Sequence, residues 1–180
     1  MKTEALCRLA LALGAAKARV LQCKDLVLSR EFRAICEKNQ CGKFGRCWMC
    51  PPDCGDIDTL MAQLQNYSTV LWYQSIHPLE DSFDIEGMLR AARAHSRLSL
   101  SIRRESRALL PGDCLYLSSG GCHLCPVCTR QTGEACRFPG EAMPSLEAYG
   151  IDVYQTTAPT ELSYINGKNT VTFFGAVLWR

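Results

Sequence analysis

Cysteine is the residue that most constrains what this chain can fold into. The 180 residues include twelve cysteines, and most of them fall into two dense groups, within residues 36–54 and 114–139. Thiols two residues apart would close only tiny disulfide loops that gain little chain entropy, so the spacing favours shared metal over cross-links. The two groups are Cys36, Cys41, Cys47, Cys50 and Cys54, then Cys114, Cys122, Cys125, Cys128 and Cys136.

The second group contains the most specific motif, three cysteines in one overlapping CxxCxxC run. Cys122, Cys125 and Cys128 follow a Gly-Gly pair that lets the backbone approach a bound group closely. Iron–sulfur clusters are held by such thiolates, and Cys136 is the candidate for the fourth ligand. In the bacterial ferredoxin run the fourth cysteine comes sooner and is followed by Pro. The pattern predicts a [4Fe–4S] cluster. Zinc is the alternative, although zinc sites usually pair two separate CxxC units.

The first group offers five thiols for at most four ligand positions. We expect its metal ligands to be Cys36, Cys41, Cys50 and Cys54, which would give the chain one or two clusters. Cys50-Pro51 resembles the Cys-Pro end of a ferredoxin motif. One hypothesis is therefore that two clusters exchange their fourth ligands, with Cys50 serving the second group and Cys136 the first.

Charge and hydropathy limit the partners and the cellular location that we expect for this chain. The formal net charge is only +2 and no nucleic-acid motif accompanies it, so we expect no nucleic-acid partner. No apolar run is long enough to span a membrane. Glu4 and Arg8 interrupt the apolar start of the chain, which favours a helix over a signal peptide. Available thiolates indicate a reducing cytoplasm, and oxygen-sensitive clusters would suit an anaerobic host.

Hydrophobic periodicity and turn residues predict a single α/β domain over residues 1–180. We expect a small mixed sheet with flanking helices, and both cysteine-rich loops at the ends of strands or helices. A strand, a long helix and another strand indicate a βαβ-like unit. The predicted helices are Thr3–Leu13, one from about Ile57 capped by Asp56 or Asp58, Phe83–Leu110 capped by Ser82 or Asp84, and Pro144–Tyr149. The predicted strands are Ala18–Leu21, Leu26–Leu28, Thr69–Tyr73, Cys114–Leu117, Ile151–Gln155, and a hairpin of Leu162–Ile165 and Thr170–Phe174 around Asn166-Gly167.

Several segments together resemble a family described as predicted metal-binding proteins, domain of unknown function 2284. They are Leu13-Gly14-Ala15 with Ala18, Cys36, Cys41-Gly42-Lys43-Phe44-Gly45, Trp48-Met49-Cys50-Pro51-Pro52, Cys122-His123-Leu124-Cys125-Pro126-Val127-Cys128, Cys136-Arg137-Phe138-Pro139, and Pro144 to Val153. The resemblance implies metal binding and no particular reaction. It also implies that the family's shared cysteines correspond to Cys36, Cys41, Cys50, Cys122, Cys125, Cys128 and Cys136, and that Cys47 and Cys54 are additions in this chain.

No hydrolase or transferase constellation accompanies the cysteines, and His77, His95 and His123 lie far apart in the sequence. We therefore expect an electron-transfer or redox accessory protein that docks transiently on a redox partner protein. One alternative is an enzyme whose cluster has an open iron, ligated by only three thiolates. Another is a zinc-binding structural or interaction module.

Overall fold

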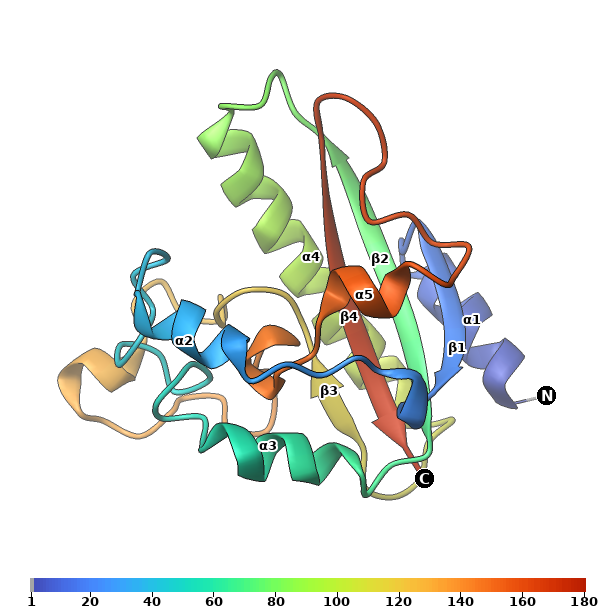
Figure 1. Cartoon of the computed structure of the whole chain (residues 1–180), viewed down its shortest axis with the longest axis horizontal. Coiled ribbons are helices and arrows are strands. Elements are labelled where there is room, and N and C mark those ends of the chain that lie inside the picture. Colours follow the sequence, from blue (N-terminus) through green and yellow to red (C-terminus); the bar gives the residue numbers. More distant parts are fainter. Residues whose placement is uncertain (1) are drawn as a thin grey trace.

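A four-stranded antiparallel sheet is the middle layer of the computed structural model, which describes residues 2–180 (Figure 1). The strands are β1 (Lys17–Gln22), β2 (Thr69–Pro78), β3 (Leu115–Leu117) and β4 (Thr170–Trp179), in the order β1-β2-β4-β3. Strands β2 and β3 are both antiparallel to β4, so they run parallel to each other with β4 between them. The predicted βαβ-like unit is thus present in split form, and the α/β class is confirmed.

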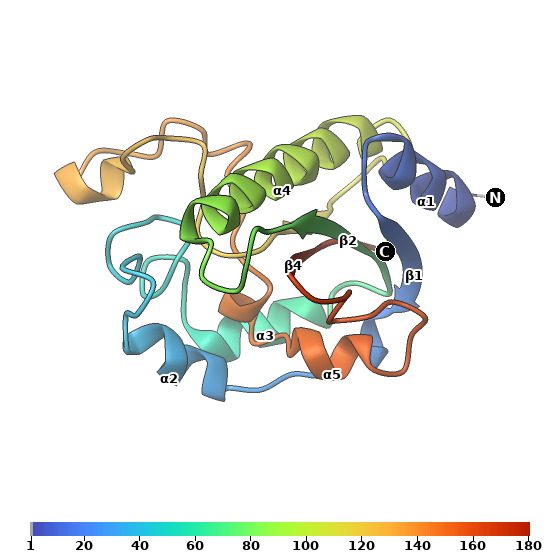
Figure 2. The same ribbon diagram turned by 90° about the horizontal axis from the view of Figure 1, so that it is seen from above.

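Helices cover both faces of the sheet (Figure 2). Helices α1 (Lys2–Ala12) and α4 (Ile85–Ser106) pack on one face, and α3 (Ile57–Leu64) and α5 (Val153–Thr157) on the other. Side chains of β2 alternate between the two cores: Val70 and Trp72 face α3 and α5, and Leu71 and Tyr73 face α1 and α4. Burial on both faces explains why this strand is a continuous apolar run. Within residues 2–180, no helix is both long and apolar enough to cross a membrane.

Two predicted N-caps set where α3 and α4 begin. The Asp56 carboxylate accepts hydrogen bonds from the backbone N–H groups of Asp58 (3.0 Å) and Thr59 (3.1 Å). The Asp84 carboxylate accepts one from Gly87 (2.7 Å). These bonds satisfy N–H groups that have no partner within the helix, which is why a side-chain cap could be predicted from sequence.

The predicted strand at Ile151–Gln155 is wrong. Of these residues, only Ile151 forms a β-bridge, and its partner is Leu28. The strand predicted at Leu26–Leu28 is likewise absent apart from this one bridge. From Val153 the chain is the short helix α5, because the Asp152 carboxylate caps it by accepting from Gln155 N–H at 2.9 Å. The cap outweighs the β-branched residues that indicated a strand. The helix predicted at Pro144–Tyr149 is reduced to the 3₁₀ turn η3 (Glu147–Tyr149).

The hairpin predicted around Asn166-Gly167 is wrong in its first half. Thr170–Trp179 forms β4, but Leu162–Ile165 is not a strand. Instead, Leu162 is buried in the core, and the Tyr164 ring stacks on Phe174 with centroids 5.9 Å apart. The segment therefore lies over a face of the sheet, and this aromatic and apolar packing replaces the strand pairing.

A buried polar chain crosses the core between α4 and the sheet. His95 Nδ1 lies 2.8 Å from Ser75 Oγ, and His95 Nε2 lies 2.9 Å from the Phe174 carbonyl oxygen. A carbonyl only accepts, so Nε2 carries the proton and Nδ1 accepts from the serine. Burial lowers the pKa of His95 to about 4, which leaves the ring neutral at neutral pH. His95 is thus a residue of the folded core and lies outside the cysteine-rich loops.

Candidate metal centre

The two cysteine-rich loops lie side by side at one end of the molecule (Figures 1 and 2). The first follows helix α2 (Glu31–Glu37) and precedes α3; the second follows β3. Ser118 ties the start of the second loop to the core, because its N–H donates to the Pro144 carbonyl and its own carbonyl accepts from Leu146 N–H, both at 3.0 Å. The scaffold thus fixes the start of the loop that carries Cys122.

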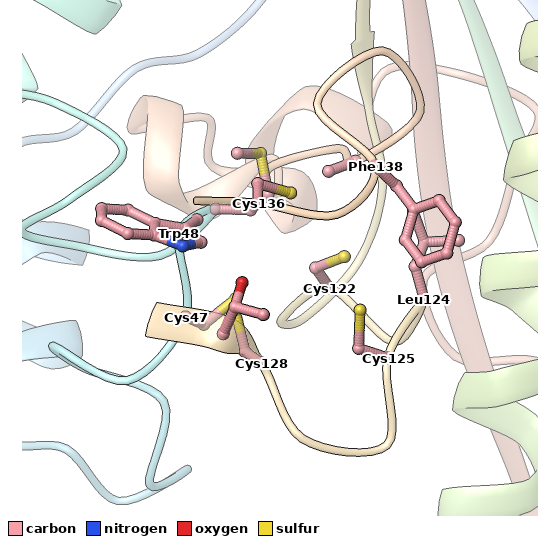
Figure 3. Close-up of a pocket in the computed structure, with 11 residues that line it drawn as sticks. Cys47, Trp48, Cys122, Leu124, Cys125, Cys128, Cys136 and Phe138 are labelled. Atoms are coloured by element: carbon pink, nitrogen blue, oxygen red, sulfur yellow. The ribbon is translucent and has the colours of Figure 1, made fainter. Parts of the chain in front are cut away.

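Five thiols line one cavity between the loops. Its empty space, including the open mouth, is about 330 Å³. Cys122, Cys125, Cys128 and Cys136, the predicted ligands of the second group, all line it, and Cys47 of the first group is the fifth. Figure 3 shows these side chains around a common space, with Leu124 and Phe138 together at one side. Apolar walls of this kind limit water and strengthen electrostatic interactions at a bound group.

Cys47 is the site residue that sequence reasoning missed. Its side chain is almost fully buried, at 1% exposure. A hydrogen bond from the Cys50 thiol lowers the pKa of Cys47 to about 6, helped by the backbone N–H groups of Met49 and Cys122 and by the charge of Lys43. The same contact, together with burial, raises the pKa of Cys50. The sequence signal was the Cys47-x-x-Cys50 spacing, which places both thiols on one tight turn.

The remaining thiols of the first group lie within electrostatic reach of one another. Burial, and next the neighbouring Cys41, raise the pKa of Cys36. Burial raises the pKa of Cys54 to about 11, with Cys36 contributing in the same direction. Cys41 and Cys54 also raise the pKa of Cys50. The four predicted ligands of this group thus influence one another electrostatically, although within residues 2–180 no three of them converge on a point that would hold one ion. Cys7, Cys23 and Cys114 pack against the cores of the scaffold, and Cys54 does so as well.

The first group also has a partly buried cation, Arg33, beside it. The Arg33 guanidinium donates from Nη2 to the Gly55 carbonyl at 2.8 Å, and its charge opposes the rise in the pKa of Cys36 and Cys54. Its Nε is buried and has no hydrogen-bond partner in the protein. A buried N–H without a partner is costly, and an anionic thiolate group beside it would supply one.

Side chains from each loop hold the other loop in place. Arg130 Nε donates to Asp53 at 2.7 Å, and its guanidinium lies 5.2 Å from the centre of the Trp48 ring. The Trp48 indole N–H donates to the Glu134 carbonyl at 3.0 Å. Arg46 donates to the Gln131 side chain at 2.7 Å. These contacts make the two loops a single unit, and they give Arg46 and Arg130 hydrogen-bond partners across the contact.

The two loops approach each other closely at Gly121. A Cβ there would lie 3.1 Å from Lys43 Cγ and 3.4 Å from Cys50 Sγ. Cys50 of the first group therefore lies against the backbone that leads into Cys122. Cys47 hydrogen-bonds to Cys50 and also lines the cavity of the second group. The two groups of cysteines are therefore in direct contact.

The sequence matches a family model over residues 19–179, with the description "Predicted metal-binding protein (DUF2284)". The chain belongs to the DUF2284 family. The match spans most of the chain and includes both cysteine-rich loops, which confirms the family expected from the sequence. No curated protein and no solved structure matches this DUF2284 protein.

The arrangement of thiols in this DUF2284 protein bears on the kind of metal group. Within residues 2–180, no three metal-binding side chains converge on a point that would hold one ion. In a tetrahedral zinc site with Zn–S bonds near 2.3 Å, the sulfurs lie only about 3.8 Å apart. The thiols that line the cavity are therefore not gathered into a tight tetrahedral site within the described residues.

Histidine adds little to this centre. His123 lies beside Cys122 in a smaller adjoining pocket with Ser118 and Gly121, and burial lowers its pKa. His77 and His95 lie by the sheet, where Ser75 hydrogen-bonds to both rings. The donor set at the loops is therefore sulfur, which suits iron–sulfur clusters or zinc among the biological metals.

Proposed function

We propose that this DUF2284 protein binds two [4Fe–4S] clusters and passes single electrons to a partner protein. The observation that carries the proposal is the common cavity of Cys122, Cys125, Cys128 and Cys136, which unites all four thiols predicted from the CxxCxxC motif. Cys36, Cys41, Cys50 and Cys54 supply four more for a second cluster. When bound, such clusters accept and release one electron each.

The contact between the two groups supports electron transfer. Cys47 lines the cavity of one group and hydrogen-bonds to Cys50 of the other, so clusters in both places would be separated by little more than these side chains. The hypothesis that Cys136 serves the first group loses support, because Cys136 lies with Cys122. With four thiols available to each cluster, every iron can have a thiolate ligand. This weighs against the alternative of an enzyme with an open iron.

The mouth of the cavity suits transient docking of a redox partner. Val127 and Phe138 expose 58% and 42% of their surface beside the cluster ligands. Small apolar contacts near a cluster are sufficient for a weak electron-transfer complex. A reducing cytoplasmic location is part of the same proposal, because thiolates stay available to metal there.

Anaerobic purification with iron, sulfide and zinc counts tests the proposal. We expect about eight irons and eight sulfides per chain, and about four of each in Cys54→Ala or in the double variant Cys122→Ala/Cys125→Ala, which leaves only three thiols at the cavity of the second group. Cys7→Ala is the matched control, because Cys7 is a partly buried thiol on α1, away from the loops, and it should keep all eight. Stoichiometric zinc without sulfide would replace the proposal with a zinc module.

A further inference from the structure

Five thiols share the cavity of the second group, whereas a [4Fe–4S] cluster offers four iron positions. One thiol is therefore surplus if the proposed function is correct. Three of the five, Cys122, Cys125 and Cys128, belong to the CxxCxxC run and come from one tight loop. The choice for the fourth position lies between Cys47 and Cys136.

Cys47 is held in the manner of a ligand. It is 1% exposed and lines the cavity together with Cys122, Cys125 and Cys128. Cys50, the next thiol of its loop, lies 3.4 Å from the position that a Cβ of Gly121 would occupy, so this part of the first loop lies against the backbone that leads into Cys122. Cys47 is therefore held at the contact between the two loops, beside the CxxCxxC thiols.

Cys136 lies on a more exposed part of the same wall. The residues on both sides of it, 131–135 and 137–140, are all exposed, and Cys136 itself is partly so. The segment is attached mainly through its neighbours: Thr129 Oγ1 donates to the Ala135 carbonyl (2.9 Å), and Trp48 donates to the Glu134 carbonyl (3.0 Å). Cys136 can therefore leave the cavity with less disturbance of the core than Cys47.

We infer that Cys47, with Cys122, Cys125 and Cys128, ligates the second cluster, and that Cys136 is a reserve thiol at the mouth of its cavity. This inference rests on the proposed function. Cys47 and Cys50, two residues apart on one turn, then each ligate a different cluster. The short segment between them becomes the covalent path from one cluster to the other, and the second cluster joins both loops.

Single and double variants test the ligand assignment by metal content. Cys136→Ala should keep about eight irons and the EPR spectrum of the unchanged protein. In Cys47→Ala, Cys136 takes the free position, so the iron count stays near eight while the EPR spectrum changes. The double variant should lose about four irons. A loss of about four irons in Cys136→Ala alone, or an unchanged spectrum in Cys47→Ala, would overturn the assignment.

A second test needs no substitution. Brief treatment of the iron-loaded protein with iodoacetamide, followed by peptide mass mapping, should label Cys136 at least tenfold faster than Cys122, Cys125 or Cys128. Equal protection of all four, lost together when the iron is removed, would contradict the reserve role. If the protein contains no iron and sulfide at all, the proposed function fails, and that outcome is distinct from either result above.

Discussion

The sheet with its helices and the pair of cysteine-rich loops are built by different forces. In the scaffold, ladders of backbone hydrogen bonds and the alternating burial of β2 determine the structure, and its side chains pack into two apolar cores. In residues 38–55 and 119–139, the secondary structure is limited to turns, bends and the 3₁₀ helix η2 (Thr129–Thr132). There, single side-chain contacts and thiols hold the chain. We therefore expect the scaffold to fold without metal and the structure of the loops to depend on bound metal.

Removing the metal should produce the largest difference between the scaffold and the cysteine-rich loops. When the metal is removed anaerobically with a chelator, backbone amides in residues 38–55 and 119–139 should lose hydrogen-exchange protection by roughly 100-fold or more. Amides of β2 and β4 should change little. Hydrogen exchange read by mass spectrometry measures both regions at once, and equal loss in loops and sheet would show that the scaffold is not independent.

Acid should weaken the scaffold through His95. Its pKa is lowered to about 4 in the folded state, so between its ordinary value near 6.5 and pH 4 the unfolded chain binds a proton that the folded chain does not. Stability is therefore full above pH 6.5 and falls by roughly 3 kcal/mol on the way to pH 4. Urea unfolding of the metal-free protein across this range measures the loss. The His95→Gln variant should be less stable at pH 7, and its free energy of unfolding should change less between pH 6.5 and pH 4. If the free energy of unfolding falls equally steeply with acid in both proteins, His95 is not the cause of the acid sensitivity.

The same glycine substitution should have different effects in the two regions. A Cβ at Gly175 in β4 would lie 2.3 Å from Tyr73 Cζ, part of a buried, rigid ring. A Cβ at Gly121 meets mainly the flexible side chain of Lys43. We expect Gly175→Ala to cost about 2–3 kcal/mol in urea unfolding and Gly121→Ala less than about 1 kcal/mol. A reversed order would mean that the loops are the more tightly packed region.

Trp48→Phe should have the smallest effect and act only in the loops. The variant keeps a ring under Arg130 but loses the donor to the Glu134 carbonyl, worth about 1 kcal/mol. We expect faster hydrogen exchange in residues 131–136 and no change in β2. Trp72→Phe is the matched control in the sheet, where the indole donates to Thr157 Oγ1 at 3.3 Å. Faster exchange in β2 of Trp48→Phe would show that the regions are coupled.

The sequence predicted best where local chemistry decides the structure. Asp56 and Asp84 mark real helix starts, and the run from Val70 to Tyr73 is a buried strand. The sequence-based predictions failed where contacts between segments far apart in the chain determine the structure. Tyr164 stacks on Phe174 instead of extending a hairpin, and β4 lies between β2 and β3 although it comes last in the chain. Sequence spacing carries no information about such contacts.

The candidate site shows the same limit. The CxxCxxC motif indicated that Cys122, Cys125 and Cys128 belong together, and the structure places them, with Cys136, in one cavity. Cys47 could not be placed by spacing, because its role depends on the two loops lying against each other. Only the fold reveals that contact, through the hydrogen bond of Cys47 to Cys50 and the close approach at Gly121.

EPR spectroscopy of the anaerobically reduced protein tests the central claim, two neighbouring [4Fe–4S] clusters, most directly. The fully reduced protein should show a broadened spectrum from two interacting spins, and Cys54→Ala should show the simple spectrum of one isolated cluster. A protein that carries zinc and gives no EPR signal after reduction, or one whose unchanged form already gives the spectrum of a single isolated cluster, would contradict the account.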